Sequence, residues 1–286
     1  MWLGVGFVRL VNLLPLVAQM RIGRVIGRLA FIFARRDRRI AAINIGLCLP
    51  ELDAKARWQL VKRHFESLGC TLFETGLVWW ASDARLRPMI NFEGVEHLRA
   101  ALAKGQGVLL LSAHFTPLEM GARALTLLGP TSIMYLKPEN PLLAELSRRG
   151  RARHTVQAIS SEQIRDLLQN LKDGLPVWYA PDQRFLDKNS ALVPLFGHPA
   201  ASNVATSRLA KISAATVLPF FPMRRADGRG YVMHIHPPFD DFPSDDPVAD
   251  TQRFHALIEA QVRRCPEQYL WAYKRFKRAD ADPYRS

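Results

Sequence analysis

Cysteine is scarce in this chain of 286 residues, which has only three, and none of them forms a Cys-x-x-Cys motif. Cys48, Cys70 and Cys265 lie far apart, which argues against a disulfide framework and against zinc, and fits a reducing compartment. The eight histidines are scattered, and only His234 and His236 are close together, with the alternating spacing of one face of a strand. The sequence therefore predicts no metal site.

The chain also lacks internal repeats, low-complexity tracts and any signature of a nucleic-acid-binding module. It is strongly basic, with a net charge of +13, which predicts attraction to phosphates or to an acidic protein. Its aromatic residues do not interleave with the basic ones as a base-stacking platform requires, so nucleic acid is not the expected partner. One alternative is a catalytically silent basic protein that binds anionic lipid or nucleic acid in a salt-sensitive way.

Acidic residues are nearly absent from residues 1–40, which contain eight arginines and only Asp37 as an acid. Residues 2–20 are mostly apolar but fall short of a clean membrane-spanning helix, because four residues interrupt them: Arg9, Asn12, Pro15 and Gln19. No convincing signal peptide is present.

The apolar segment that follows carries a basic stripe. On a single helix one face would hold four arginines: Arg21, Arg24, Arg28 and Arg35. Such a stripe is typical of an interfacial membrane anchor that binds anionic lipid. If residues 2–20 span instead, these arginines place the rest of the chain in the cytoplasm. The alternative is a buried N-terminal helix with solvated arginines.

Short apolar runs alternate with helical patterns through most of the chain. The expected strands are 108–111, 132–136, 176–180, 216–222 and 231–236, and the expected helices are 54–81, a helix after Pro117, 141–149, 161–172, 201–213 and 248–264. Residues 54–81 could also form two helices separated by a break. This alternation predicts a layered α/β domain with a mixed, largely parallel sheet flanked by helices. A turn-rich link at 225–230 indicates a hairpin. We expect a membrane anchor at 1–40 and a catalytic domain at 41–286.

The most informative tract is LLLSAHFTPLE at 109–119. It places His114 at the carboxyl end of a buried strand, where open α/β sheets bind ligands. Glu119 follows closely enough to orient the ring, which makes His114 a candidate general base. Glu119 also fits a capping box with Thr116 as N-cap and Pro117 at the first helical position. The two roles are compatible because a carboxylate has two oxygens.

Further charged residues follow other expected strands. Lys137 ends the run 133–136, Asp182 ends VWYAPD, and SRRGRARH contains four arginines: Arg148, Arg149, Arg151 and Arg153. Their positions after strands allow them to converge on the sheet edge that carries His114. Each also has an ordinary structural explanation, since Asp after Pro is common in turns and arginine clusters are usually solvated.

Several stretches, in this order, resemble the late acyltransferases of lipid A biosynthesis, the lauroyl/myristoyl transferase family of the Gram-negative inner membrane. They are RRIAAINIGLCLPEL (38–52), HFESLGCTLFETGLVWW (64–80), LLLSAHFTPLEMGAR (109–123), KPENPLLAEL (137–146), GRAR (150–153), VWYAPDQ (177–183), GRGYVMHIHPP (228–238) and PEQYLWAYKRFKR (266–278). The resemblance runs nearly end to end.

The resemblance implies a fold similar to glycerol-3-phosphate acyltransferases, with their His-x-x-x-x-acid signature. It implies acyl transfer from acyl carrier protein to a hydroxyl of a Kdo-bearing lipid A precursor, on the cytoplasmic side of the inner membrane and among its anionic lipids. His114 would be the base and Glu119 its orienting acid. No cofactor or covalent acyl-enzyme is implied, because the donor thioester is already activated.

By the same resemblance, four residues would bind substrate: Lys137, Arg151, Arg153 and Asp182. Arg151 or Arg153 would be the family's active-site arginine, binding phosphate or the developing oxyanion. Lys137 stands where the family usually has arginine, which loses bidentate geometry toward a phosphate. Another amphiphilic acceptor, such as a glycolipid or a lysophospholipid, therefore stays open as an alternative.

Overall fold

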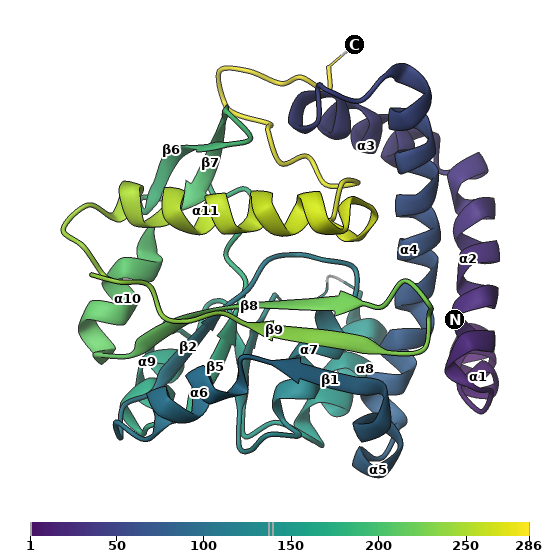
Figure 1. Ribbon diagram of the computed structural model, residues 1–286. Helices are drawn as coiled ribbons and strands as arrows, with labels where there is room; N and C mark the ends of the chain where they lie inside the picture. Colours follow the sequence, from purple (N-terminus) through teal and green to yellow (C-terminus); the bar gives the residue numbers. More distant parts are fainter. Residues whose placement is uncertain (1, 137, 139, 286) are drawn as a thin grey trace.

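The computed structural model describes residues 2–136, 138 and 140–285, and its centre is a seven-stranded sheet with the order β1-β9-β8-β2-β5-β3-β4 (Figure 1). The strands of this sheet are β1 (Ile90–Glu93), β2 (Val108–Leu111), β3 (Ser132–Tyr135), β4 (Ala158–Ser160), β5 (Pro176–Tyr179), β8 (Thr216–Arg224) and β9 (Tyr231–Ile235). Neighbours pair in parallel except β8 and β9, which form an antiparallel hairpin. The expected mixed, largely parallel sheet is confirmed.

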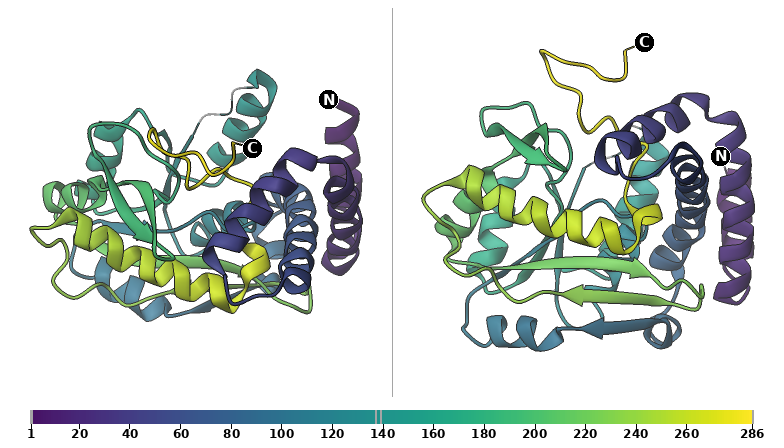
Figure 2. Two further views of the ribbon diagram at one scale, coloured as in Figure 1. Left: turned by 90° about the horizontal axis from the view of Figure 1, so that it is seen from above. Right: turned by 45° about the horizontal axis from the view of Figure 1, so that its top comes forward.

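Helices cover both faces of the sheet and one of its sides (Figures 1 and 2). They are α1 (Trp2–Val11), α2 (Leu16–Phe33), α3 (Arg35–Cys48), α4 (Ala54–Trp80), α5 (Asp83–Leu86), α6 (Val95–Leu102), α7 (Leu118–Leu125), α8 (Pro141–Ala152), α9 (Ile164–Lys172), α10 (Ala205–Ser213) and α11 (Pro247–Arg264). Two short 3-10 turns are η1 (Arg87–Met89) and η2 (Pro266–Gln268). The segment 54–81 is thus one helix, α4, which begins where the Asp53 side chain accepts a hydrogen bond from the Ala56 amide.

The central strands are apolar on both faces because both are covered, as parallel sheets require. All four residues of β2 and all four of β5 are buried. Alternate residues enter opposite cores: Leu109 and Leu111 pack on the face of α11, whereas Leu110 joins the cluster beneath α6 and α7. Leu111 is paired with Tyr179, so β2 and β5 end at the same edge of the sheet.

A second, two-stranded sheet was not expected from the sequence. It is the antiparallel hairpin of β6 (Ser190–Leu195) and β7 (His198–Asn203). β7 takes residues 201–203, so the helix expected at 201–213 begins only at Ala205. The hairpin turn places Phe196 at φ 50° and Gly197 at φ 74°. Two consecutive residues with positive φ are typical of two-residue hairpin turns. Phenylalanine rarely occupies such a position, so the sequence did not indicate a hairpin here.

The N-terminal helices lie against α4 (Figure 1). Pro15 separates α1 from α2, and α2 ends at Phe33. Arg35 begins the next helix, so the expectation that it shares one helical face with Arg21, Arg24 and Arg28 was wrong. Among the described residues, no helix combines the length and the apolar character needed to cross a membrane.

Glycines set the close approach of α2 to α4. A Cβ atom on Gly27 would lie 2.1 Å from the Phe65 carbonyl oxygen, and one on Gly69 would lie 2.1 Å from the carbonyl oxygen of Gly23. Any side chain here meets backbone that cannot rotate away. The two helix backbones therefore touch only because these positions carry glycine.

Replacing Gly27 by alanine is expected to force α2 away from α4. We expect Gly27→Ala to lower the free energy of unfolding by about 1–3 kcal/mol, the usual effect of overpacking. The matched control is Gly46→Ala in α3, where the new Cβ would meet only the Arg57 side chain at 3.6 Å. That control should stabilise the protein by about 0.5–1 kcal/mol through helix propensity. Urea denaturation of both variants measures the difference, and equal effects would contradict this packing.

A buried histidine makes stability depend on pH. Burial lowers the pKa of His64 to about 4, against a weaker opposing effect of its hydrogen bond to the Glu267 carbonyl (3.2 Å). As pH falls from about 6.5 to 4, the unfolded chain binds a proton that the folded chain refuses. Stability should therefore fall by about 1.4 kcal/mol per pH unit from this group. Urea denaturation between these pH values should show a shallower loss in His64→Gln than in the wild type, and parallel curves would contradict the assignment.

Candidate functional site

His114 and Asp182 meet at the edge of the sheet where β2 and β5 end. Each lies three residues beyond the last residue of its strand. The ring Nδ1 of His114 lies 2.5 Å from Asp182 Oδ1, and the His114 backbone N–H donates to Asp182 Oδ2 at 2.9 Å. One carboxylate thus fixes both the backbone and the ring of the same histidine. The His114 side chain is 24% exposed and that of Asp182 only 3%.

The protonation of the pair follows from these contacts. Burial would raise the pKa of Asp182, but the nearby His114 and its two hydrogen bonds outweigh burial and hold that pKa below its ordinary value. The carboxylate is therefore ionised at neutral pH and only accepts hydrogen bonds. Nδ1 of His114 must then carry the ring proton, which leaves Nε2 with a free lone pair. This is the tautomer that a general base needs.

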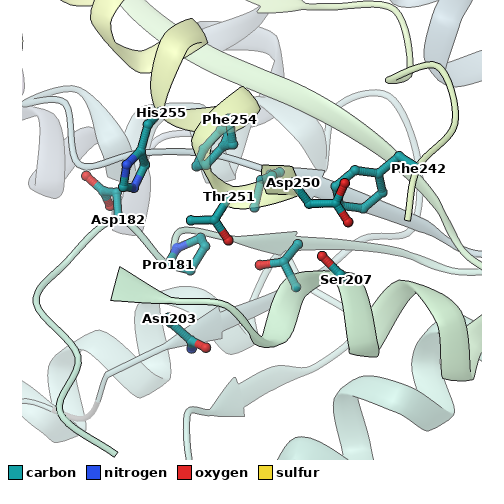
Figure 3. A pocket seen from close by; sticks show the side chains of 11 residues that line it. Pro181, Asp182, Asn203, Ser207, Phe242, Asp250, Thr251, Phe254 and His255 are labelled. Atoms are coloured by element: carbon teal, nitrogen blue, oxygen red, sulfur yellow. The ribbon is translucent and has the colours of Figure 1, made fainter. Parts of the chain in front are cut away.

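A small cavity of about 10 Å³ adjoins Asp182 (Figure 3), and His114 is not among the residues that line it. Asp182 and His255 both line it, and burial is the main cause that lowers the pKa of His255 to about 4. His255 is therefore neutral. The buried guanidinium of Arg275, held by the Ala201 carbonyl (2.8 Å) and Ser202 Oγ (2.6 Å), helps to lower the pKa of Asp182. The surroundings thus favour a charged Asp182.

The loop that carries His114 is held by backbone hydrogen bonds on both sides. The Leu270 amide donates to the His114 carbonyl at 3.0 Å, and the Thr116 amide donates to the Gln268 carbonyl at 2.6 Å. The Phe115 ring packs edge-on against Tyr269 with centroids 5.5 Å apart. Residues 268–270, which follow α11, therefore pair with the His114 loop in a short antiparallel bridge.

A buried ion pair connects the His114 loop to α4. Arg224 donates to both carboxylate oxygens of Glu74, at 2.6 and 2.7 Å, and through Nη1 to Ser67 Oγ at 2.8 Å. Ser67 Oγ also shares a hydrogen bond with Thr116 Oγ1, 2.7 Å away, in which either hydroxyl can be the donor. Thr71 Oγ1 donates to the Thr116 carbonyl at 3.0 Å. We call these five residues the α4 clamp: Ser67, Thr71, Glu74, Thr116 and Arg224.

Glu119 has a different partner from the one expected. Its two oxygens accept hydrogen bonds from Nε and Nη2 of Arg151, whereas Asp182 takes the place beside His114 where Glu119 was expected. The capping box is also wrong, because α7 begins at Leu118 with no side-chain cap and Thr116 belongs to the α4 clamp. A guanidinium attracts a carboxylate more strongly than a neutral ring does, which explains the pairing.

Arg151 is held in a fixed orientation at the wall of the site. Its guanidinium lies over the Tyr135 ring, 4.7 Å from the centroid, and is bonded to Glu119. Its Nη1 is buried and has no hydrogen-bond partner among the described residues. A buried cationic donor without a partner is a place for a substrate oxygen.

The other basic candidates lie elsewhere. Arg153 is exposed and does not line the pocket at His114, and its one hydrogen bond to a described residue is a long contact (3.5 Å) to the Trp79 carbonyl. Arg148 and Arg149 pair with Glu145 on the surface of α8. Lys137 lies outside the described residues. Of the two arginines that the resemblance offered, the structure therefore brings only Arg151 to the site.

A pocket of about 380 Å³ opens in front of His114. Its polar lining includes His114, Glu119 and Arg151 together with Ser161, Gln183, Arg184 and Asn203. Much of the rest is apolar or aromatic: Leu118, Met134, Tyr135, Leu136, Trp178, Tyr179 and Phe185. Within the described part of the chain, no cluster of three potential metal-ligating side chains is found. The arrangement fits a substrate with an apolar chain and a reacting oxygen at its end.

Sequence reasoning missed the groups that support the pair. Ser67, Arg224, Tyr269 and Arg275 are far from His114 in the chain and form no local motif with it. Tyr269 and Arg275 do fall within the stretch 266–278, which carried part of the resemblance. Ser67 likewise falls within the stretch 64–80, so these two stretches carried the signal for three of the four residues.

Known proteins resemble the chain over nearly its whole length. The family model described as bacterial lipid A biosynthesis acyltransferase matches residues 1–278. A lipid A biosynthesis lauroyltransferase of Escherichia coli (strain K12) is 36% identical over 277 residues, which cover 96% of this chain and 90% of that protein. A palmitoleoyltransferase of the same strain is 35% identical over 280 residues, and a myristoyltransferase is 25% identical over 289 residues, with 90% of each protein covered.

The geometry predicts that Asp182, and not Glu119, sets the tautomer of His114. Asp182 accepts two donors, whereas asparagine has one oxygen and must turn its amide toward one of them. We expect ¹⁵N NMR of histidine-labelled protein to show Nδ1–H in the wild type and in Glu119→Gln, and a changed tautomer population in Asp182→Asn. A His114→Gln sample assigns the signal. The reverse pattern would contradict the geometry.

Proposed function

The chain belongs to the bacterial lipid A biosynthesis acyltransferase family, and from that premise we propose that it moves a fatty acyl chain from an acyl carrier protein thioester to a hydroxyl of a Kdo-bearing lipid A precursor. The observation that carries the proposal is the oriented His114–Asp182 pair at the polar end of an apolar pocket.

His114 acts as the general base in this proposal. Its Nε2 takes the proton of the acceptor hydroxyl as that oxygen attacks the thioester carbonyl carbon. The carbon–sulfur bond then breaks, and the imidazolium returns the proton to the departing thiolate. Asp182 holds the ring and stabilises the imidazolium, as the buried acid of a catalytic triad does. The thioester is already activated, so neither a covalent acyl-enzyme nor a cofactor is required.

Arg151 binds the oxygen on which charge develops. Its Nη1 has no hydrogen-bond partner among the residues that the structure describes, and its other nitrogens are fixed by Glu119. A donor fixed before the reaction stabilises an oxyanion without reorganising. Glu119 thus acts as a positioning residue for Arg151.

The net charge of the chain and its exposed apolar side chains support the proposed partners. A net charge of +13 suits both an acidic acyl carrier protein and an acceptor that carries phosphates and carboxylates. The N-terminal segment exposes large apolar side chains: Trp2, Leu3, Phe7 and Leu10 on α1, Leu13 in the turn that follows, and Val25, Leu29, Ile32 and Phe33 on α2. Together with the arginines of α2, this surface supports association with the anionic inner membrane, with the catalytic domain on the cytoplasmic side.

Mass spectrometry of reaction products tests the proposal. Purified protein in mild detergent receives acyl carrier proteins of mixed acyl length and a Kdo-bearing tetra-acylated lipid A precursor. We expect one acyl mass increment with the wild type, and a rate lowered by roughly 10²–10⁴ in His114→Ala. No increment from folded wild-type protein would contradict this acceptor, and a lysophospholipid arm then tests another amphiphile.

A matched arginine pair separates the site from general charge effects. Arg151→Gln removes the buried donor and should lower the rate by roughly 10²–10³, the usual effect of losing an oxyanion donor. Arg153→Gln removes the same charge two residues away and should leave the rate within about twofold. Equal losses in the two variants would contradict the role given to Arg151.

A further inference from the structure

A second pocket, on the far side of the α4 clamp from the His114 loop, lies between α2, α4 and the turn that joins β8 to β9. Its volume is about 380 Å³. Its lining is unusually rich in arginine and includes Arg24, Arg28, Arg63, Glu66, Ser67, Cys70, Arg224, Arg225, Ala226, Glu267 and Gln268. We propose that this pocket binds a phosphate monoester.

Three of its five arginines already have acidic partners. Arg28 pairs with Glu66 at 2.7 Å, Arg225 with Asp227 at 2.8 Å, and Arg224 with Glu74 at 2.6 Å. These pairs fix the walls of the pocket. They contribute little net positive charge to its interior.

Arg24 and Arg63 are the two cations left over. Neither makes an ion pair or a hydrogen bond with any residue that the structure describes, and only the Glu267 carboxylate in the lining offsets them. Arg24 is half-buried, and its Nη2 would lie 3.4 Å from a Cβ placed on Gly228, so its guanidinium reaches the β8–β9 turn. Arg63 enters from α4. The two donors therefore approach the pocket from different helices.

The floor of the pocket is buried and cannot move easily. Ser67 and Gln268 are both buried and fully engaged: Ser67 Oγ with Arg224 and Thr116, and Gln268 with both backbone groups of Arg224 (2.8 and 2.9 Å). A rigid polar floor beneath two unpaired guanidinium groups lowers the cost of ordering a bound anion.

A phosphate monoester matches this arrangement better than a single carboxylate does. It presents three oxygens and close to two negative charges at neutral pH, which can engage two guanidinium groups from different directions. The pocket also has room for more than the phosphate itself. Val25 and Leu29, each one residue beyond Arg24 and Arg28, are exposed on the adjoining face of α2. Apolar surface beside the pocket favours a phosphate carried on a lipid.

Vesicle binding by the full-length protein tests the site. The probes are phosphatidylcholine vesicles that contain a minority of phosphatidic acid, matched vesicles with phosphatidylglycerol, and inorganic phosphate as a competitor. The test variant is Arg24→Gln/Arg63→Gln. The control is Arg99→Gln/Arg208→Gln, which removes two exposed arginines of α6 and α10 and changes the net charge equally.

We expect the test variant to lose about tenfold in affinity for phosphatidic acid vesicles, and the control to lose less than about twofold. Competition by millimolar inorganic phosphate would identify a site that also accepts free phosphate, and its absence would assign the site to lipid-borne phosphate. Equal losses in both variants, or equal binding of phosphatidylglycerol, would overturn the proposal, because general charge attraction would then explain the binding.

Separate controls exclude effects of folding and of acyl transfer on the binding result. Thermal unfolding of both double variants should match the wild type, since none of the exchanged guanidinium groups makes an ion pair or a hydrogen bond with the residues that the structure describes. The binding assay contains no acyl donor and no lipid A precursor. Its outcome is therefore independent of whether the proposed acyl transfer holds.

Discussion

Two hydrogen bonds from one histidine to one buried carboxylate organise the rest of this structure. Asp182 accepts both the backbone amide and the ring nitrogen of His114, so the position, the rotamer and the tautomer of the base share one cause. The bonds form only because β2 and β5 are neighbours in parallel register and end together. Sheet order thus determines the chemistry at this edge.

The loop that bears the base is held in place by polar groups that contribute little to stability by themselves. A buried pair such as Arg224–Glu74 gains about what its desolvation costs, yet removal of one partner costs about 3–5 kcal/mol. Its effect is geometric: through Ser67 it holds Thr116, two residues from His114. Ser67 and Arg224 of the same clamp also line the proposed phosphate pocket. Catalytic geometry and the proposed phosphate site therefore rest on one rigid support.

Much of the fold could be predicted because the strands and turns are indicated by residues that are close together in the sequence. Apolar runs bounded by turns located β2, β5 and β8, and the turn-rich link located the β8–β9 hairpin. The site could be predicted only in part. His114 and Asp182 were each found at a strand end, but they lie 68 residues apart, and strand order cannot be read from periodicity. Spacing favoured Glu119 as the partner of His114 because the two are close in sequence, whereas Arg151, 32 residues after Glu119, attracts that carboxylate more strongly.

The most direct test of the account is a double-mutant cycle on acyl transfer rates with His114→Ala, Asp182→Asn and the combined variant. If Asp182 acts through His114, the combined variant should be about as slow as His114→Ala alone, because residues that act as a unit are not additive. Losses that multiply in the combined variant would contradict the account, since Asp182 would then contribute independently of the base it orients.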